Sequence, residues 1–244
     1  QGSMLLNIVD DKLTDGPDPS LLTRWTPAVF VACYPFGTPA FSLRAYAKRS
    51  FRMPTFNDLY YADMGNSALR PETATQYNIG VLYERQYRGG MLQSMRLQAD
   101  AYRNYIDDKI TAYPEGQQFR WTMMNLGKVR ITGTDISADA TLRLPAGIAM
   151  TTRLQYTYQD ARDVTNRNDS YYNDQIAYIP YHSGSLMLGM KWRRWSANYS
   201  FIYTGLRYSQ QENILYNRLQ PWYTSDLNIM RTLTLGKTQM RVTL

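Results

Sequence analysis

Residues 147–160 read Gly-Ile-Ala-Met-Thr-Thr-Arg-Leu-Gln-Tyr-Thr-Tyr-Gln-Asp, and this stretch decides the fold class. Mostly apolar and aromatic side chains occupy every second position from Ile148 to Tyr158, and mostly polar ones fill the positions between. A period of two over about a dozen residues predicts a β-strand rather than a helix. Ordinary strands have about five or six residues, whereas a tilted strand needs about nine to eleven to cross a bilayer. The stretch therefore predicts a strand of membrane-crossing length.

The same alternation recurs along the chain, and no stretch is a convincing helix, domain boundary or low-complexity run. We count about ten strands or part-strands. The main ones are predicted to be antiparallel and paired in sequence order, at about 40–51, 75–87, 92–106, 128–144, 147–160, 184–193, 195–208 and 222–235. Alternation alone does not distinguish a membrane barrel from a soluble sandwich, because a sandwich also turns a polar face to water.

The links between these strands alternate strictly between short and long. Short ones lie near Gly37-Thr38-Pro39, Arg88-Gly89-Gly90, Pro145-Ala146-Gly147, Arg193-Arg194 and Gly236-Lys237. Long polar ones lie at about 11–26, 52–74, 107–126, 160–178 and 208–221. Outer-membrane barrels show this asymmetry, with tight turns on one rim and long loops on the other, whereas Greek-key sandwiches do not require it. We therefore expect a membrane barrel whose loops 52–74, 107–126 and 160–178 gather on one rim.

The alternation also assigns the two faces of the strands. We predict that the lipid side carries Ile148, Met150, Leu154, Phe201 and Tyr203. The lumen side is predicted to carry Arg153, Gln155 and Asn198. An arginine that faces lipid at the middle of the bilayer costs roughly 2–4 kcal/mol, so the hydrophobic pattern constrains the register.

Composition is compatible with this architecture. The chain has 244 residues, 44% of them hydrophobic, and a mean hydropathy of −0.47. No run of about 18 apolar residues is present, so no transmembrane helix is expected. The 21 tyrosines suit a membrane interface, because tyrosine combines an apolar ring with a hydroxyl group that seeks water. A tyrosine-rich soluble β-sandwich would account for the composition equally well.

Several function classes are disfavoured. With one cysteine, Cys33, and one histidine, His182, the chain offers no internal disulfide and no His/Cys metal cluster. The net charge of +7 is scattered along the chain, which indicates lumen lining and interface anchoring rather than nucleic-acid binding. His182 is interpreted as structural. The acidic residues Asp107, Asp108, Asp160, Asp163, Asp169 and Asp174 lack calcium-loop spacing and are interpreted as solvated loop charges. No catalytic motif is present, so we expect no enzyme, metal site or cofactor.

The stretch 51–72 is the most informative motif. It reads Phe51-Arg52-Met53-Pro54-Thr55-Phe56-Asn57-Asp58-Leu59-Tyr60-Tyr61, then Gly65-Asn66, Leu69 and Pro71-Glu72. Proline cannot donate to a strand ladder, so Pro54 ends the preceding strand. The aromatic residues after it would form a semi-rigid, adhesive surface at the mouth of a barrel.

This stretch resembles the Phe-Arg-x-Pro-Thr-Phe-x-Asp-Leu-Tyr … Gly-Asn-x-x-Leu-x-Pro-Glu signature of TonB-dependent receptor barrels. The matching residues are Phe51, Arg52, Pro54, Thr55, Phe56, Asp58, Leu59, Tyr60, Gly65, Asn66, Leu69, Pro71 and Glu72. Asn125-Leu126-Gly127-Lys128-Val129 with Gly133 and Asp135 resembles a second family pattern, Asn-x-Gly-x-x-x-x-x-Gly-x-Glu, with Asp in place of Glu. Trp222 and Asp226-Leu227 are similar to the late strands of the family. The resemblance covers about 27–244.

The resemblance implies an all-β antiparallel transmembrane barrel of about 22 strands in the bacterial outer membrane, of which this chain holds about ten. It also implies an N-terminal plug and a TonB-binding box, neither of which is recognisable in the sequence. The ending Met240-Arg241-Val242-Thr243-Leu244 lacks the terminal aromatic that is usual in the family. We therefore expect residues 5–244 to be part of a barrel, with residues 1–4 resembling the remnant of a cleaved tag. Asp10-Asp11 and Gly16-Pro17-Asp18-Pro19 mark a loop within 5–26.

The implied function is energy-dependent uptake of a scarce small-molecule ligand, with outer-membrane lipid, the TonB complex and, as an option, a surface lipoprotein as partners. Haem receptors of the family carry a histidine in this region, whereas residues 55–65 contain none. This favours a siderophore or a cobalamin-like ligand over haem. Candidate ligand contacts are Tyr60, Tyr61, Trp121, Tyr171 and Tyr172. The alternatives are a passive porin-like channel and a soluble tyrosine-rich sandwich that acts as a binding module.

Overall fold

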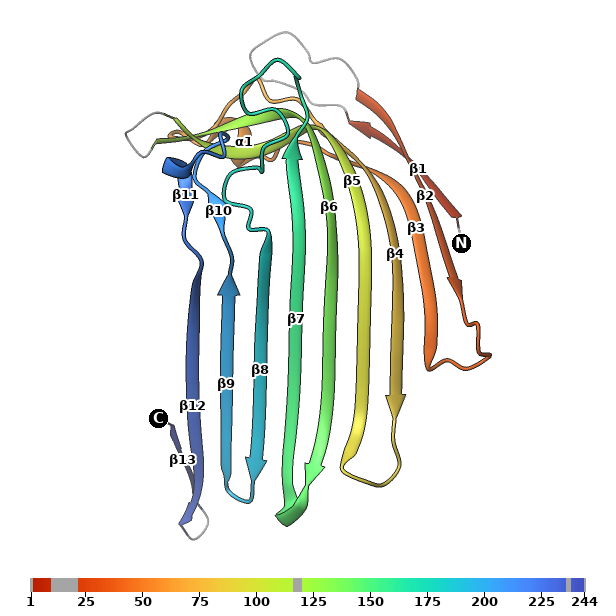
Figure 1. Ribbon diagram of the computed structural model, residues 1–244, viewed down its shortest axis with the longest axis vertical. Helices are drawn as coiled ribbons and strands as arrows, with labels where there is room; N and C mark the ends of the chain where they lie inside the picture. Colours follow the sequence, from red (N-terminus) through yellow and green to blue (C-terminus); the bar gives the residue numbers. More distant parts are fainter. Residues whose placement is uncertain (1, 10–21, 116–119, 236–237, 244) are drawn as a thin grey trace.

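The computed structural model describes residues 2–9, 22–115, 120–235 and 238–243, and its main feature is one tall antiparallel sheet (Figure 1). Eleven strands follow one another across the sheet in chain order, with only the short β10 and β11 left out. They are β1 (Gly2–Val9), β2 (Leu22–Cys33), β3 (Phe41–Arg52), β4 (Glu72–Gln86), β5 (Leu92–Glu115), β6 (Arg120–Leu144), β7 (Ile148–Asp163), β8 (His182–Trp192), β9 (Trp195–Thr204), β12 (Trp222–Leu235) and β13 (Thr238–Thr243). The predicted sequential antiparallel pairing is therefore confirmed.

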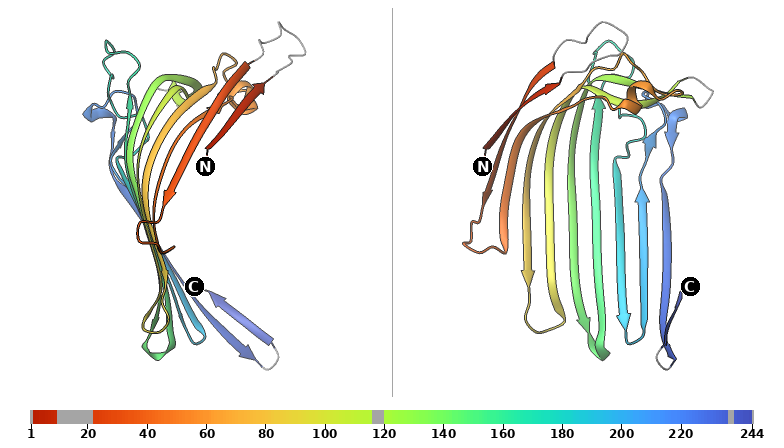
Figure 2. Two further views of the ribbon diagram at one scale, coloured as in Figure 1. Left: turned by 90° about the vertical axis from the view of Figure 1, so that its right-hand side faces the viewer. Right: turned by 180° about the vertical axis from the view of Figure 1, so that it is seen from behind.

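The sheet is curved and twisted, and β1 and β13 lie at its two opposite edges (Figure 2). The described residues form this sheet and a two-stranded ribbon of β10 (Arg207–Tyr208) and β11 (Arg218–Leu219), without a second large sheet packed against the first. The sandwich alternative is therefore wrong for the described part of the chain, which is an incomplete barrel wall. No helix among the described residues is long and apolar enough to cross a membrane.

Tight turns join the strands at the lower rim in Figure 1. At the β4–β5 turn, Gly89 and Gly90 have φ of 85° and 81°, a left-handed backbone that glycine adopts without steric cost. The 3₁₀ turn η1 (Pro145–Gly147) joins β6 to β7, and Arg193, with φ 53°, turns β8 into β9. The short links within the described residues are thus turns on one rim, as expected, while Gly236-Lys237 lies outside the described part.

The strand register sorts side chains onto two faces. One cross-strand row runs Glu84, Arg96, Asp139, Arg153, Met187, Ser200 and Asp226. We call its side the polar face. The next row runs Tyr83, Leu97, Ala138, Leu154, Leu186, Phe201 and Ser225 on the opposite side, the apolar face. All five residues predicted to face lipid lie on the apolar face, and Arg153, Gln155 and Asn198 lie on the polar face.

The apolar face is open to its surroundings. Ile79 is 64% exposed and Leu154 is 47% exposed, although both lie in the middle of long strands. In a soluble protein such side chains would form the core, and an exposed apolar patch of this extent marks an interaction surface. A band of apolar side chains on the outside of a barrel wall is the arrangement that lipid requires.

Three predicted segments need correction. Residues 107–126 were predicted to be a polar loop, but β5 continues to Glu115 and β6 begins at Arg120, pairing Lys109 with Leu126 and Glu115 with Arg120, while residues 116–119 lie outside the described part. Ile110 lies in this extension, and its side chain is buried. In 5–26, β1 and the start of β2 flank the predicted loop, whose residues 10–21 lie outside the described part. The third segment, 195–208, was predicted to be one strand, but β9 ends at Thr204 and β10 belongs to the separate two-stranded ribbon.

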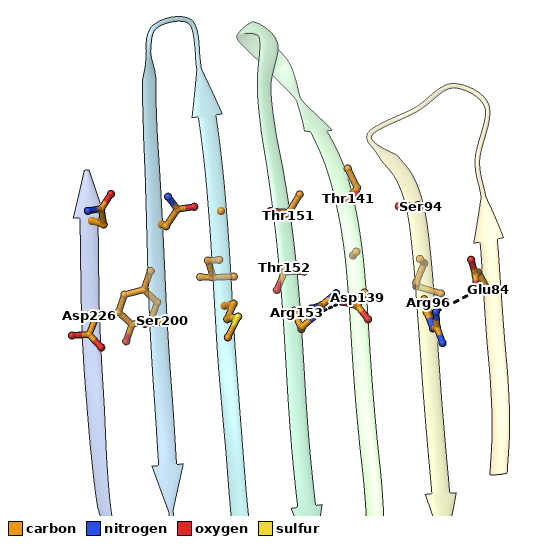
Figure 3. A pocket seen from close by; sticks show the side chains of 18 of the residues that line it. Glu84, Ser94, Arg96, Asp139, Thr141, Thr151, Thr152, Arg153, Ser200 and Asp226 are labelled. Carbon is orange, nitrogen blue, oxygen red and sulfur yellow. Dashed lines mark hydrogen bonds and ion pairs between the residues drawn. The ribbon is translucent and has the colours of Figure 1, made fainter. Parts of the chain in front are cut away.

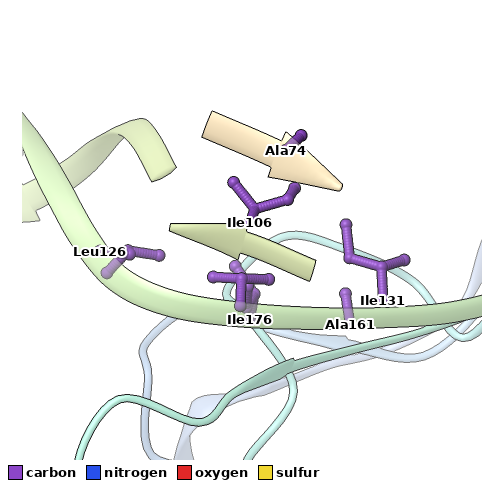
Figure 4. Close-up of a cluster of buried hydrophobic side chains, with 7 residues drawn as sticks. Ala74, Ile106, Leu126, Ile131, Ala161 and Ile176 are labelled. Atoms are coloured by element: carbon purple, nitrogen blue, oxygen red, sulfur yellow. The ribbon is translucent and has the colours of Figure 1, made fainter. Parts of the chain in front are cut away.

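A small hydrophobic core lies at the upper end of the sheet, where the loop after β7 folds over it (Figure 4). Strand residues such as Ala74, Ile106 and Ile131 meet Ile176 of that loop. Ala161 is 0% exposed in the same cluster. The well-packed part of this wall is therefore the upper rim, which carries the long loops.

Candidate ligand-binding rim

The upper rim begins with a short helix that the sequence analysis did not predict, α1 (Phe56–Tyr60). Thr55 caps it: its hydroxyl accepts from the Asp58 N–H at 3.2 Å, and the Asp58 carboxylate accepts from the Thr55 N–H at 2.8 Å. This reciprocal capping box needs a Ser or Thr and an acidic residue three positions later, which Thr55 and Asp58 supply. The Thr55–Asp58 spacing in the motif is therefore the sequence signal that could have predicted this helix.

Arg52 links this helix to the neighbouring strands. Its guanidinium lies 3.0 Å from Asp58 Oδ2 and 3.8 Å from Glu72 Oε2. Glu72 in turn accepts from the Ile110 N–H at 3.0 Å. Burial by itself would raise the pKa of Asp58, but the hydrogen bonds from Thr55 and the charge of Arg52 together hold that pKa below its ordinary value. The charged motif residues therefore act as a brace between β3, α1, β4 and the β5–β6 hairpin.

Two asparagines fasten the loop after α1 to the same hairpin. Asn66 donates to the Met123 carbonyl at 2.9 Å, and the Met123 N–H donates to Met64 at 2.8 Å. Asn125 accepts from the Arg70 N–H at 2.8 Å and donates to the carbonyls of Arg70 and Asp108. Asn66 and Asn125 belong to the two family-like motifs, so these motifs meet in space.

Two motif glycines have no room for a side chain. A Cβ on Gly65 would lie 2.6 Å from the Tyr61 nitrogen, and one on Gly127 would lie 2.4 Å from Thr165 Cγ2. The Gly127 contact is accompanied by a hydrogen bond of 2.9 Å from the Lys128 N–H to the Thr165 hydroxyl. Glycine at position 127 therefore lets the loop after β7 approach β6 closely.

The loop after β7 is held by side-chain amides that the sequence analysis missed, one of them fully buried. Gln175 is 0% exposed; its side chain accepts from the Ala161 N–H at 2.9 Å and donates to the carbonyls of Gln159 and Ile179. Asn213 bonds to both the N–H and the carbonyl of Gln175. Glutamine and asparagine in polar loops carry no sequence signal for burial, so only the structure identifies this connection between the loops after β7 and β9.

The acidic residues of these loops are more engaged than predicted. Asp163 lies in β7 with 5% exposure and accepts from the Thr165 N–H at 2.8 Å. Asp108 pairs with Arg70 at 2.6 Å, and Asp160 pairs with Arg162 at 2.7 Å. Asp174 accepts from the Asn213 N–H at 2.9 Å. The prediction of solvated loop charges is therefore wrong for these carboxylates, which hold the loops in place.

The five predicted contact residues all lie on this rim but do not form one contact cluster. Tyr60 and Tyr61 are 48% and 56% exposed, and the Tyr60 ring lies 5.0 Å from that of Phe56. Trp121 packs against Tyr178 at 5.4 Å. Tyr171 lines a cleft of about 300 Å³ with Tyr113, Gln210, Gln211, Glu212 and Asn217, while Tyr172 follows in the same loop. The described parts of segments 52–74, 107–126 and 160–178 gather at one end of the sheet, as expected, although the second of them is a strand hairpin (Figure 1).

A second, larger cleft of about 640 Å³ lies on the polar face toward the opposite rim (Figure 3). Arg153 pairs with Asp139 at 2.6 Å, and Arg96 pairs with Glu84 at 3.8 Å. Hydroxyl and amide groups surround these pairs, including those of Thr141, Thr151 and Asn198. A wall of paired charges and neutral donors suits a water-filled or protein-filled interior rather than lipid.

Potential metal ligands do not cluster on the described part of the chain. Among those residues, no group of three or more His, Cys, Asp or Glu side chains could hold a metal ion. His182 lies on the apolar face, where its Nδ1 is 2.8 Å from the Tyr156 hydroxyl and its ring lies 5.2 Å from that of Tyr158.

Comparison with known proteins agrees with this architecture. A family model for the TonB-dependent receptor-like β-barrel matches residues 9–244. The chain is 39% identical over 88 residues to the vitamin B12 transporter BtuB of Vibrio vulnificus, which covers 36% of this chain and 13% of that protein. It is 26% identical over 186 residues to BtuB of Photobacterium profundum, covering 72% of this chain and 27% of that protein.

Among solved structures, the ferric citrate transporter FecA in its unliganded form superposes with a TM-score of 0.63 at 14% identity, covering 88% of this chain and 31% of that one. At this identity the likeness shows the fold alone. The chain spans less than a third of the length of each of these three proteins. Because the family model covers nearly all of the sequence, this chain belongs to the TonB-dependent receptor family and forms part of an outer-membrane β-barrel.

Proposed function

We propose that the complete receptor containing this chain takes up a scarce chelate across the outer membrane, with energy supplied through TonB, and that the ligand is cobalamin-like or a siderophore. The observation that supports this proposal is the hydrogen bonding between the loops of the upper rim. Loops from four different strand connections are joined by hydrogen bonds, including Asn66 to Met123, Tyr113 to Gln210 and Asn213 to Gln175. A receptor for a dilute ligand needs such a preformed surface, because ordering loops on binding reduces affinity.

Cobalamin is the first ligand to test, since two of the proteins similar in sequence are vitamin B12 transporters. The exposed rings of Tyr60 and Tyr61 are suited to contact a large ligand with apolar and polar parts. Equilibrium binding of cobalamin and of ferric siderophores to the complete receptor separates the two ligand classes.

For the ligand that binds, we expect Tyr60→Ala, Tyr61→Ala and Trp121→Ala each to weaken binding by about tenfold, the effect typical of an aromatic anchor. Tyr34→Ala is the matched control: Tyr34 is 56% exposed but follows β2 at the opposite rim. An equal loss of ligand affinity in the control and in the rim variants would contradict the proposal that the ligand binds at the upper rim.

Uptake by cells distinguishes the receptor from the passive channel. Uptake that saturates with ligand concentration and stops when TonB is deleted is expected of the receptor. Linear uptake that is independent of TonB would support the porin-like alternative instead.

A further inference from the structure

Two arginines on the apolar face have no ionic partner. Arg49 of β3 and Arg103 of β5 are both exposed, and neither takes part in an ion pair among the described residues. Three arginines of the polar face, Arg44, Arg96 and Arg153, each pair with a carboxylate. Unpaired cations are thus found on the face that is otherwise apolar.

These arginines flank two aromatic side chains. In the strand register, Arg49 of β3 lies opposite Thr75 of β4, and Thr75 lies opposite Tyr105 of β5. Arg103 of β5 lies opposite Tyr77 of β4. Arg49 and Arg103 lie on strands about 10 Å apart, with β4 between them, so both side chains can reach the same point over β4. The Arg103 guanidinium lies 5.4 Å from the Tyr105 ring centre. A cation–π contact orients the guanidinium but leaves its N–H groups free to donate. We call Arg49, Tyr77, Arg103 and Tyr105 the arginine–tyrosine patch.

The depth of this patch in the membrane follows from the strands. On the same face of β4, Tyr77 is followed by Ile79 and Val81, which are 64% and 39% exposed. On β5, Arg103 follows Ala101 and Ala99 in the same way. The patch therefore lies where the apolar band ends, toward the rim with the long loops. Arginine at this depth costs about 0–1 kcal/mol, and tyrosine is enriched there.

The surrounding charge is positive. Lys128 and Arg130 of β6 lie on the same face, and Asp107 lies opposite Lys128 in the strand register. Asp160 of β7 lies in the row of Arg103 and is paired with Arg162, a further cation of this face, at 2.7 Å. Arg130 donates to the Asn173 side chain at 2.9 Å. Five cations (Arg49, Arg103, Lys128, Arg130 and Arg162) and two carboxylates (Asp107 and Asp160) lie on this part of the face, and their net positive charge attracts an anion.

We propose that the arginine–tyrosine patch binds the phosphate-bearing headgroup of a lipid in the leaflet next to the long-loop rim. The forked guanidinium groups match phosphate oxygens, and the acyl chains would lie along Ile79 and Val81 just beneath. A free phosphate ion would gain the same charge contacts but none of the apolar ones. This site is separate from the rim that is proposed to bind the transported ligand.

The experiment measures lipid binding to the complete receptor in detergent by native mass spectrometry. The probe is phosphatidic acid, whose phosphate is exposed, compared with phosphatidylcholine of the same chains. The test variant is Arg49→Gln with Arg103→Gln. The matched control is Arg85→Gln, because Arg85 is exposed on the same face, lies 5.4 Å from the Tyr87 ring and belongs to the opposite end of β4. Circular dichroism and heat-resistant migration in gels confirm that each variant is folded.

We expect phosphatidic acid to bind the parent in preference to phosphatidylcholine and to bind the double variant about 30-fold more weakly, the effect of removing two cations from an anionic interface. Binding to Arg85→Gln should be unchanged. Equal binding to parent and folded double variant would overturn the proposal, as would an equal loss in Arg85→Gln. Displacement by an equal concentration of inorganic phosphate would also overturn it, because the site would then bind free phosphate.

Discussion

At the scale of single residues, the family-like motifs of this chain are bonded to one another. Arg52, Asp58 and Glu72 form a charged brace, while Asn66 and Asn125 fasten the α1 loop to the β5–β6 hairpin. Sequence reasoning identified these positions by resemblance and assigned the binding role to the aromatic residues among them. It did not predict the asparagine bonds, because hydrogen bonds between residues some 55 positions apart depend on the register of strands that bend at the rim.

Replacing Asn125 with Leu should loosen this loop. The change removes the acceptor for the Arg70 N–H and the donor to the Arg70 and Asp108 carbonyls, at about 1–3 kcal/mol for partly exposed groups. Hydrogen exchange should show faster exchange of the Arg70 and Met123 amides. Asn228→Leu serves as the control, since it replaces the same residue type on the polar face of β12, away from this loop. Unchanged exchange at Arg70 would show that Asn125 does not hold the loop.

The cap of α1 should respond to pH. The pKa of Asp58 is lower in the folded protein than its ordinary value, so the charged carboxylate stabilises the helix at neutral pH. That contribution is present above the ordinary carboxyl pKa and is lost as the pH falls through the lowered value. Hydrogen-exchange protection of α1, corrected for intrinsic rates, should therefore decrease with acid in the parent but much less in Asp58→Asn. The same decrease in both proteins would assign the pH dependence to another group.

At the scale of elements, the strands were the most predictable part of the chain. The alternation around Leu154 and Gln155 gave the correct register because a one-residue slip would turn every apolar side chain of β7 to the other face. The extension of β5 and β6 through 107–126 was not predicted. The ladder skips Asp108 on β5, where φ is 55°, and Gly127 on β6, and this shifts the phase of the alternation although pairing resumes with Lys109 and Leu126.

A charge placed on neighbouring positions of β7 tests the two faces. Leu154→Arg should destabilise the protein in lipid by about 2–4 kcal/mol, because the side chain lies in the middle of the apolar band. Gln155→Arg, one residue further on and on the polar face, should have little effect. Reversible urea unfolding in vesicles measures both. Similar costs for the two variants would mean that the face assignment is wrong.

At the scale of the whole molecule, β1 and β13 are the two unpaired edges of the sheet. Within lipid, each unpaired N–H and C=O at such an edge costs several kcal/mol, and outside lipid the edges invite pairing with other chains. The sequence predicted an incomplete barrel from a family resemblance. The number of strands needed for closure could not be obtained from the alternation, because each strand pattern describes only its own two faces.

The isolated chain should therefore not behave as a discrete monomer. Sedimentation in detergent should show swapped or aggregated copies, whereas refolding together with the remaining strands of the receptor should give one defined complex. A monodisperse monomer of this chain alone, with both edges covered by its own residues, would contradict the incomplete-barrel assignment.

On the upper rim, different residues hold the loops and present exposed aromatic rings, and this separation has a consequence for evolution. Asn66, Asn125, Gln175 and Asn213 hold the loops through backbone atoms, whereas the exposed rings of Tyr60 and Tyr61 take no part in those bonds. Substitutions at the exposed rings thus leave the loop scaffold intact, so selection can alter the cargo one mutation at a time. Related receptors with diverged cargoes are then expected to vary at the rings while keeping the amides, a pattern that sequencing of close homologues would reveal.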